Sequence, residues 1–264
     1  MKVALINKEK IDMFIAMFQL LKSCTSAVTL RFDIDKLYIQ GMDKAHVCLF
    51  DITIQRNWFN KYEMGEGSVL VEDIELCVDC NCINAIISRI QDGNMLELYY
   101  NENDPDKLDI NLINDENVKG EYNRYFRIPL LDLENELLDI PQVDYDAEIT
   151  ISCKHLIDLT SQLIIFGENL DIKCSEEILQ LKANGDMGEM KVNIDIDDLK
   201  EFAICEGEEI NLSYSLNYVH KMCLTNKLVS NVELSISATY PMRIKYDLGA
   251  DSNIMFFLAP KVEE

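Results

Sequence analysis

The middle of the sequence contains a stretch, residues 124–145, that separates two halves of similar pattern and so limits the folds available to the chain. Pro129 and Pro141 bracket it, and a residue before proline is pushed towards extended backbone. The stretch is too acidic for a core strand, yet its leucines make it too apolar for an ordinary solvated linker. We therefore predict an ordered connector along a surface, with an N-terminal domain at 1–122, a connecting loop at 123–145 and a C-terminal domain at 146–264.

Both halves repeat one order of helices and strands. Four segments carry apolar residues at helical spacing and are the predicted helices, namely 8–24, 81–91, 154–166 and 215–228. Runs that alternate apolar and polar residues accompany each helix, as in antiparallel strands with one buried face. Each half thus reads helix, strands, helix, strands. This order favours an α+β fold of two similar units, with helices on one face of antiparallel sheets.

Composition narrows the class of protein. The chain has 264 residues, 48% of them hydrophobic, which suffices for two cores. Its formal net charge of −23 argues against a simple basic nucleic-acid binder. A chain with this net charge can still have a basic surface in one place. No targeting signal opens the chain and no run approaches the ~20 apolar residues that cross a bilayer, so we expect no membrane. Nine cysteines without a disulfide spacing indicate reduced thiols in a cytosolic or nuclear protein.

Acidic residues are spread unevenly along the chain. The four predicted helices together carry a small positive net charge, whereas the remaining segments are strongly acidic. If the helices share one face, a polyanion could lie against that face through phosphate contacts without base readout. The alternative is that the helices simply place lysines on solvated faces.

One cysteine cluster offers a different chemistry. Cys77 and Cys80 have the Cys-x-x-Cys spacing that forms half of many zinc or redox sites, and Cys82 follows them. A structural zinc usually needs four ligands, but the sequence has no second such pair and its three histidines are isolated. We therefore expect ordinary thiols and no metal site.

No catalytic motif stands out in the sequence. It lacks a Walker-type phosphate loop, a Gly-x-Ser-x-Gly elbow and a His-Glu-x-x-His pair. Its many carboxylates could pair as acid and base or hold a metal, but a solvated acidic surface is the simpler interpretation. We expect no enzyme activity and no cofactor.

Four short motifs resemble the eukaryotic sliding clamp family of proliferating cell nuclear antigen (PCNA). Residues 41–49, GMDKAHVCL, resemble the loop after the family's second strand, and residues 137–141, LLDIP, resemble its interdomain connecting loop. The end of the chain, FLAPKVEE at 257–264, is similar to the family's C-terminal tail, and Tyr240-Pro241 to its penultimate hairpin. These motifs keep the family's order and spacing and together cover the whole chain.

The resemblance implies a DNA clamp fold, in which two topologically similar domains place antiparallel sheets outside and four helices on the inner face. Three identical subunits would close head to tail into a ring by pairing strand edges, which match residues 108–112 and 188–195 here. The ring would encircle duplex DNA in the nucleus without sequence preference. It would serve as a polymerase processivity factor in replication and repair, placed on DNA by a clamp loader, without catalysis of its own.

The resemblance also implies two sets of contact residues. Partner proteins would carry a PIP-type motif, a short segment whose aliphatic and aromatic side chains fill an apolar pocket. The matching pocket residues are Met42, His46, Val47, Leu49, Leu138, Ile140, Pro141, Pro241, Phe257, Ala259, Pro260 and Val262. The matching DNA-facing residues are Lys10, Lys22, Arg89, Lys154, Lys221 and Lys227.

The sequence departs from the family in two respects. Channel-facing helix positions that are Lys or Arg in the family read Asp158, Ser161, Asn217 and Leu224 here. The family's modifiable lysine lies in a Cys-x-Lys-Asp-Gly turn, whereas residues 174–177 read CSEE. Two alternatives therefore stay open, a subunit of a heterotrimeric checkpoint-type clamp and a secondary PCNA paralogue with a DNA-damage role.

Overall fold

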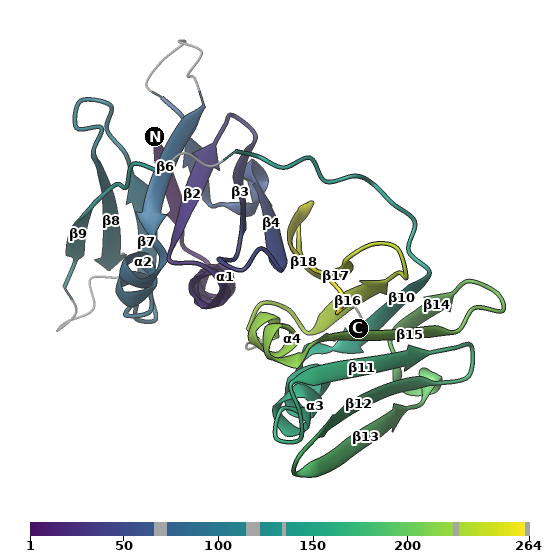
Figure 1. Ribbon diagram of the computed structural model, residues 1–264. Helices are drawn as coiled ribbons and strands as arrows, with labels where there is room; N and C mark the ends of the chain where they lie inside the picture. Colours follow the sequence, from purple (N-terminus) through teal and green to yellow (C-terminus); the bar gives the residue numbers. More distant parts are fainter. Residues whose placement is uncertain (66–72, 115–121, 134–135, 224–226, 262–264) are drawn as a thin grey trace. The chain divides into compact units, whose positions relative to one another are not determined.

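The computed structural model describes residues 1–65, 73–114, 122–133, 136–223 and 227–261. The chain forms two compact units, whose elements are labelled in Figure 1. Unit 1 comprises Met1–Gly41, Asp51–Leu138 and Leu248–Ile254, and unit 2 comprises Met42–Phe50, Asp139–Asp247 and Met255–Glu264. No described helix is long and apolar enough to span a membrane.

Unit 1 contains a five-stranded antiparallel sheet in the order β5-β1-β7-β8-β9. Its strands are β1 (Lys2–Leu5), β5 (Lys61–Glu63), β7 (Asn94–Tyr99), β8 (Lys107–Asn114) and β9 (Arg124–Pro129). A second set of strands, which lie wholly or partly in unit 1, comprises β2 (Ala27–Phe32), β3 (Lys36–Met42), β4 (Cys48–Gln55) and β6 (Ile74–Asp79). In this set β2 pairs antiparallel with β3 and with β6, and a single 3-10 turn, Arg56–Trp58, follows β4.

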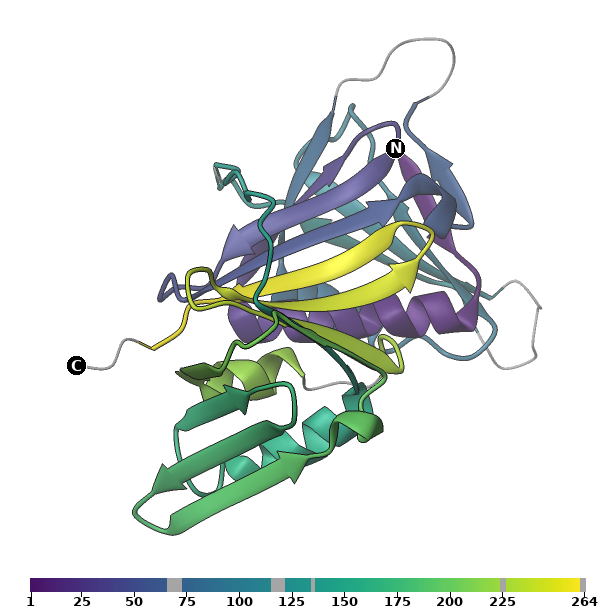
Figure 2. The same cartoon turned by 90° about the vertical axis from the view of Figure 1, so that its right-hand side faces the viewer.

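Two helices, α1 (Lys8–Cys24) and α2 (Cys80–Ile87), pack together in unit 1. α1 begins where the Asn7 side chain accepts the N–H of Lys10, which satisfies one of the donors that lack an intrahelical partner. Its buried face recurs every three to four residues, as at Phe14, Phe18 and Leu21. Figure 2 shows this helix, in purple, running alongside the strands of unit 1. The predicted helix at 8–24 is confirmed with these bounds.

Unit 2 repeats the plan of unit 1. Its four-stranded antiparallel sheet has the order β13-β12-β11-β15, formed by β11 (Asn169–Cys174), β12 (Leu179–Gly185), β13 (Gly188–Ile194) and β15 (Ile210–Ser215). The other strands that lie wholly or partly in unit 2 are β10 (Ala147–Ser152), β14 (Glu201–Ile204), β16 (Asn231–Ile236), β17 (Met242–Gly249) and β18 (Ser252–Leu258), and a 3-10 turn lies at Ile196–Asp198. Helices α3 (Cys153–Leu163) and α4 (Leu216–Met222) pack against each other. The described residues thus hold four α-helices, two in each unit, and the predicted α+β fold of two similar units is confirmed.

Three helices are shorter than the sequence predicts. α2 stops at Ile87 and not at residue 91, and α3 stops at Leu163 and not at residue 166. In both, the first N–H after the helix still bonds a carbonyl four residues back, but the next two bond carbonyls three residues back, so tighter turns replace the last predicted helical turn. α4 stops at Met222 and not at residue 228, and residues 224–226, which include Leu224, lie outside the described residues.

One predicted sheet edge is misplaced. The edge predicted at 108–112 belongs to β8, which pairs with β7 on one side and with β9 on the other. The edge strand is β9, in residues that the sequence assigns to the connector. Only Ile128 in β9 is buried, so the apolar alternation that marks a strand is weak there. The second predicted edge, at 188–195, corresponds to β13, which does end its sheet.

Candidate functional site

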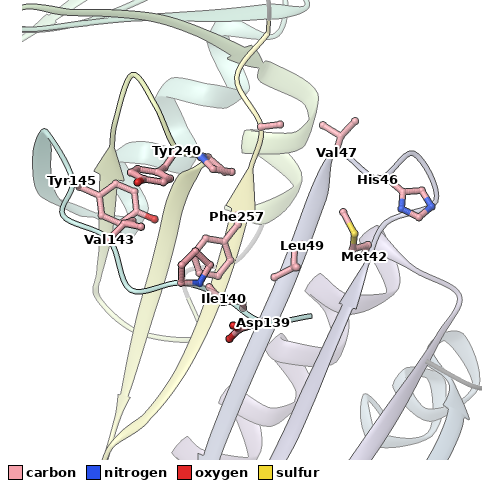
Figure 3. Close-up of a pocket in the computed structure, with 13 residues that line it drawn as sticks. Met42, His46, Val47, Leu49, Asp139, Ile140, Val143, Tyr145, Tyr240 and Phe257 are labelled. Carbon is pink, nitrogen blue, oxygen red and sulfur yellow. The ribbon is translucent and has the colours of Figure 1, made fainter. Parts of the chain in front are cut away.

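An apolar cavity of about 250 Å³ opens in unit 2. Four segments line it: residues 42–49, residues 139–145, the turn at 240–241 and the end of β18 (Figure 3). The lining residues are Met42, His46, Val47, Leu49, Asp139, Ile140, Pro141, Val143, Tyr145, Tyr240, Pro241, Phe257 and Ala259. An apolar hollow with a few polar groups at its margin suits the capture of apolar side chains from a ligand or partner.

Strand geometry directs two side chains into this cavity. In β4, Cys48 and Phe50 are buried in the core, so the intervening Leu49 points to the opposite face, where the cavity lies. In β18, Phe256 is buried in the core while its neighbour Phe257 lines the cavity. Because neighbouring side chains in a strand alternate between faces, packing of one face in the core determines which side chains line the cavity.

One carboxylate organises the loop at 43–48, which carries two lining residues. Asp43 is 5% exposed, and its oxygens accept the backbone N–H groups of residues 45, 47 and 48 at 2.8–2.9 Å. The Tyr218 hydroxyl donates to the same carboxylate at 2.5 Å. Burial raises the pKa of Asp43, but these four donors outweigh burial and hold the pKa below its usual range. His46 adopts left-handed backbone with φ of 57°, and the carbonyl of Val47 accepts the N–H of Ala259 at 3.2 Å.

A glutamine anchors the connector within unit 1. Gln40 is 3% exposed, donates from Nε2 to the carbonyl of Leu138 at 2.8 Å and accepts the Leu138 N–H at Oε1 at 2.7 Å. The side-chain amide thus makes the pair of hydrogen bonds with the Leu138 backbone that a residue of a neighbouring strand would make. Asp51 lies 3.5 Å from the same Nε2 and accepts the Tyr38 hydroxyl at 2.5 Å. Burial raises the pKa of Asp51, opposed by its contacts with Tyr38 and Gln40.

Replacing Gln40 by Ala should release the backbone of Leu138. Two hydrogen bonds disappear, each worth about 0.5–1.5 kcal/mol, so hydrogen exchange at the Leu138 amide should accelerate at least about fivefold. Hydrogen-exchange NMR measures this rate. Gln180→Ala is a matched control, because it removes an exposed contact with Asn193 in unit 2 and should leave Leu138 unchanged. Unaltered exchange in the Gln40 variant would mean that other contacts hold the connector.

Most residues implied for partner binding surround this one cavity. They are Met42, His46, Val47, Leu49, Ile140, Pro141, Pro241, Phe257 and Ala259. Leu138 and Pro260 are not among the described residues that line it, and Val262 lies outside the described residues. For Leu138 the reason is geometric, since its backbone is engaged by Gln40 and its side chain is 46% exposed.

Sequence reasoning missed four lining residues. Asp139 and Tyr240 lie inside two of the motifs, LLDIP and Tyr240-Pro241, but were left out of the set of implied pocket residues. Val143 and Tyr145 had no signal beyond their place in the connector. The guanidinium of Arg243 lies 4.8 Å from the centre of the Tyr145 ring, a cation–π contact that fixes the ring at the cavity margin.

The implied DNA-facing residues have different surroundings. Exposed side chains are those of Lys22, Arg89, Lys154 and Lys227. Lys10 is instead turned inward, where its ammonium donates to the carbonyl of Trp58 at 2.6 Å and lies 5.6 Å from the centre of that ring. Lys221 on α4 is half-buried and lies 5.8 Å from the ring of Tyr218. Lys10 can therefore reach a phosphate only by leaving its internal contact.

In the cysteine cluster, Cys77 and Cys80 are buried and Cys82 is half-buried. Burial raises the pKa of Cys80 to about 12 and also raises the pKa of Cys77 and of Cys82. Such groups stay protonated at neutral pH, whereas metal binding and nucleophilic attack use the thiolate. In the part of the chain that the structure describes, no group of three or more His, Cys, Asp or Glu side chains could hold a metal ion.

Comparisons with known proteins give one family for nearly the whole chain. The model of the PCNA N-terminal domain matches residues 7–137, and that of the PCNA C-terminal domain matches residues 139–261. PCNA of Chaetomium thermophilum is 26% identical over 229 residues, which cover 85% of each chain. Proliferating cell nuclear antigen 2 of Plasmodium falciparum is 26% identical over 259 residues, covering 94% of this chain and 95% of that relative. The DNA polymerase sliding clamp of Pyrococcus furiosus is 24% identical over 230 residues, 87% of each chain.

Solved structures share the fold. PCNA from Thermococcus kodakaraensis superposes with a TM-score of 0.84 at 17% identity, covering 98% of this chain and 99% of that one. A chain of the PCNA2–PCNA3 complex from Sulfolobus tokodaii superposes with a TM-score of 0.84 at 23% identity over the full length of both. Because the two domain models of one family account for nearly all of the sequence, the chain belongs to the proliferating cell nuclear antigen family of DNA sliding clamps.

Proposed function

We propose that three copies of this DNA sliding clamp close head to tail into a ring around duplex DNA. The two edge strands support this assembly, because β9 in unit 1 and β13 in unit 2 differ in sequence and end different sheets. Two unlike edges on one chain form a head-to-tail contact, and such a contact closes a ring when its rotation fits. Tyr125 on β9 is 68% exposed and Met187 beside β13 is 77% exposed, so each edge offers apolar surface for burial.

The cavity in unit 2 is the single observation that carries the recruitment function. Its lining is almost wholly apolar, and its volume suits aliphatic and aromatic anchors of a PIP-type segment, each worth about 2–4 kcal/mol. Residues 139–141 beside it form no described strand or helix, so their backbone can pair with an extended peptide. A polymerase or another replication or repair protein held there stays tethered to the DNA inside the ring.

The same proposal includes where the clamp acts and which molecules it meets there. The protein acts in the nucleus, a clamp loader opens the ring onto DNA, and the clamp makes and breaks no bond itself. The relative named a DNA polymerase sliding clamp supports a polymerase as one partner. The exposed Lys22, Arg89, Lys154 and Lys227 provide phosphate contacts without base readout.

Solution mass and peptide binding test this function together. Light scattering over a range of concentrations should give about 91 kDa, three times the 30.4 kDa of one chain. A fluorescent peptide with an aliphatic anchor and aromatic anchors should bind, and the same peptide with its aromatic residues changed to Ala should not. A monomer that persists at high concentration would contradict the homotrimer, and equal binding of both peptides would contradict the pocket.

A second candidate is a clamp that requires other subunits, either as part of a heterotrimeric checkpoint-type ring or as a secondary PCNA. The PCNA2–PCNA3 complex shares the fold, and the Plasmodium relative named PCNA 2 matches 94% of this chain. This candidate predicts that the purified protein stays monomeric and reaches the mass of a ring only after a related chain is added.

A further inference from the structure

One side chain supplies most of the hydrogen bonds that shape the cavity loop at 43–48, which has two backbone hydrogen bonds of its own, from the N–H of Asp43 to the Cys48 carbonyl and from the N–H of His46 to the Asp43 carbonyl. Lys44, Ala45 and His46 are exposed, so burial does little to order the loop, and the positive φ of His46 is unfavourable for a residue with a side chain. The Asp43 carboxylate compensates by accepting three N–H groups of the loop. Oδ1 takes those of Val47 and Cys48, and Oδ2 takes that of Ala45.

The fourth donor to this carboxylate comes from a different element. Tyr218 lies on α4, 175 positions away along the chain, and its hydroxyl reaches Oδ2 of Asp43. A hydrogen bond to an ionised acceptor is stronger than a neutral one and is directional. The contact therefore ties the orientation of the carboxylate, and with it the loop, to α4.

The loop sets two walls of the cavity. His46 and Val47 line it directly, and the Val47 carbonyl holds the N–H of Ala259, which lines it from the end of the chain. Rotation of the Asp43 carboxylate would release the loop N–H groups and shift both walls. Binding sites lose affinity when such supporting contacts are missing, because the bound shape then has to be ordered by the ligand.

We propose that Asp43 and Tyr218 are positioning residues for the partner-peptide site, so that α4 sets the shape and affinity of a cavity it does not line. The inference rests on the proposed peptide-binding function. Neither residue lines the cavity, so both act through the loop.

Tyr218→Phe is the primary test, because it removes one hydroxyl and keeps the ring. We expect peptide affinity to fall about tenfold and amide exchange at residues 45, 47 and 48 to accelerate about tenfold. Tyr214→Phe is the matched control, since this tyrosine lies four residues earlier, in β15, and its buried hydroxyl has no hydrogen-bond partner among the described residues. It should change neither measurement, and both variants should keep the mass of the wild-type assembly.

Asp43→Asn separates this role from a general loss of stability. The Asn amide keeps one accepting oxygen for the loop, but its NH₂ cannot accept from Tyr218. Affinity should be intermediate between wild type and Asp43→Ala, and adding Tyr218→Phe to Asp43→Asn should weaken binding less than about twofold. Equal loss from Tyr218→Phe in both backgrounds would overturn the inference, as would wild-type affinity in the single variant.

The two proposals fail in distinguishable ways. If the wild-type protein binds no such peptide, the recruitment function is wrong, and the exchange rates of the loop amides still decide whether Tyr218 positions the loop. If the wild type binds and exchange accelerates evenly across unit 2 rather than in the loop, Tyr218 is an ordinary core residue and the inference is overturned.

Discussion

Replacing Ile140 by Asp should nearly abolish binding of the peptide with aliphatic and aromatic anchors. Ile140 lines the cavity, and no lysine or arginine occurs among the described residues that line it. When the peptide binds, its apolar anchors would displace the water around a carboxylate at this position, and no cation would replace that water. The free energy cost of desolvating an unpaired charge is high. We expect affinity to fall at least about 100-fold, or about 3 kcal/mol. Fluorescence anisotropy of the labelled peptide measures the change.

Leu137→Asp is the control for this experiment. Leu137 lies on the same connector, is 51% exposed and is not among the described residues that line the cavity. It adds the same charge three residues away, where water screens it, so affinity should change less than about threefold. Equal losses in the two variants would mean that overall charge, and not the cavity, governs binding. Light scattering should show the wild-type mass for both.

Replacing Trp58 by Ala should lower the free energy of unfolding by about 3–5 kcal/mol. Trp58 is 1% exposed, its indole N–H donates to the carbonyl of Leu248 at 3.2 Å, and its ring meets Phe59 edge to face at 5.5 Å. The substitution therefore leaves a large cavity and an unpaired carbonyl in the core of unit 1. Urea unfolding followed by circular dichroism measures the loss, because Trp58 is the one tryptophan of the sequence and its fluorescence disappears with it.

Trp58→Phe serves as the comparison. It keeps an aromatic ring and removes the indole N–H, so the loss should be about 1–2 kcal/mol. Protein concentration must be equal in all three measurements, since assembly stabilises the folded chain. A loss below about 1 kcal/mol in the Ala variant would contradict the role of this side chain in the core. Peptide affinity of folded Trp58→Phe should equal that of the wild type, because Trp58 does not line the cavity in unit 2.

Periodic patterns predicted helices and strands best in long elements that bury one face along their whole length. The helix at 8–24 was predicted with the observed bounds, since its apolar face persists over the whole length and Asn7 caps its start. The later helices were predicted too long, because apolar residues such as Ile90 and Phe166 continue the pattern after the hydrogen bonding has changed to three-residue turns. The periodicity of a sequence shows which side chains are apolar, but it does not show which carbonyl each backbone N–H group bonds.

Strand β9 shows the same limit in a sheet. Its residues alternate between half-buried and exposed, apart from buried Ile128, so the sequence resembles a linker more than a strand. Its neighbour β8 alternates fully, and the resemblance to the family placed the sheet edge there. An edge strand has a partner on one side only and buries fewer side chains, so β9 is recognised by its backbone pairing with β8 rather than by its own residues.

The sequence by itself determined the two-unit repeat, the α+β class and, through the motifs, most of the residues around the cavity. Each of these depends on local periodicity or on short runs of residue types. Only the tertiary structure decided which polar groups hold that cavity in shape. Gln40 meets Leu138 across 98 positions and Asp43 meets Tyr218 across 175, and neither pair leaves a local pattern. A single hydrogen bond depends on distance and direction between folded elements, whereas apolar periodicity is already present in the unfolded chain.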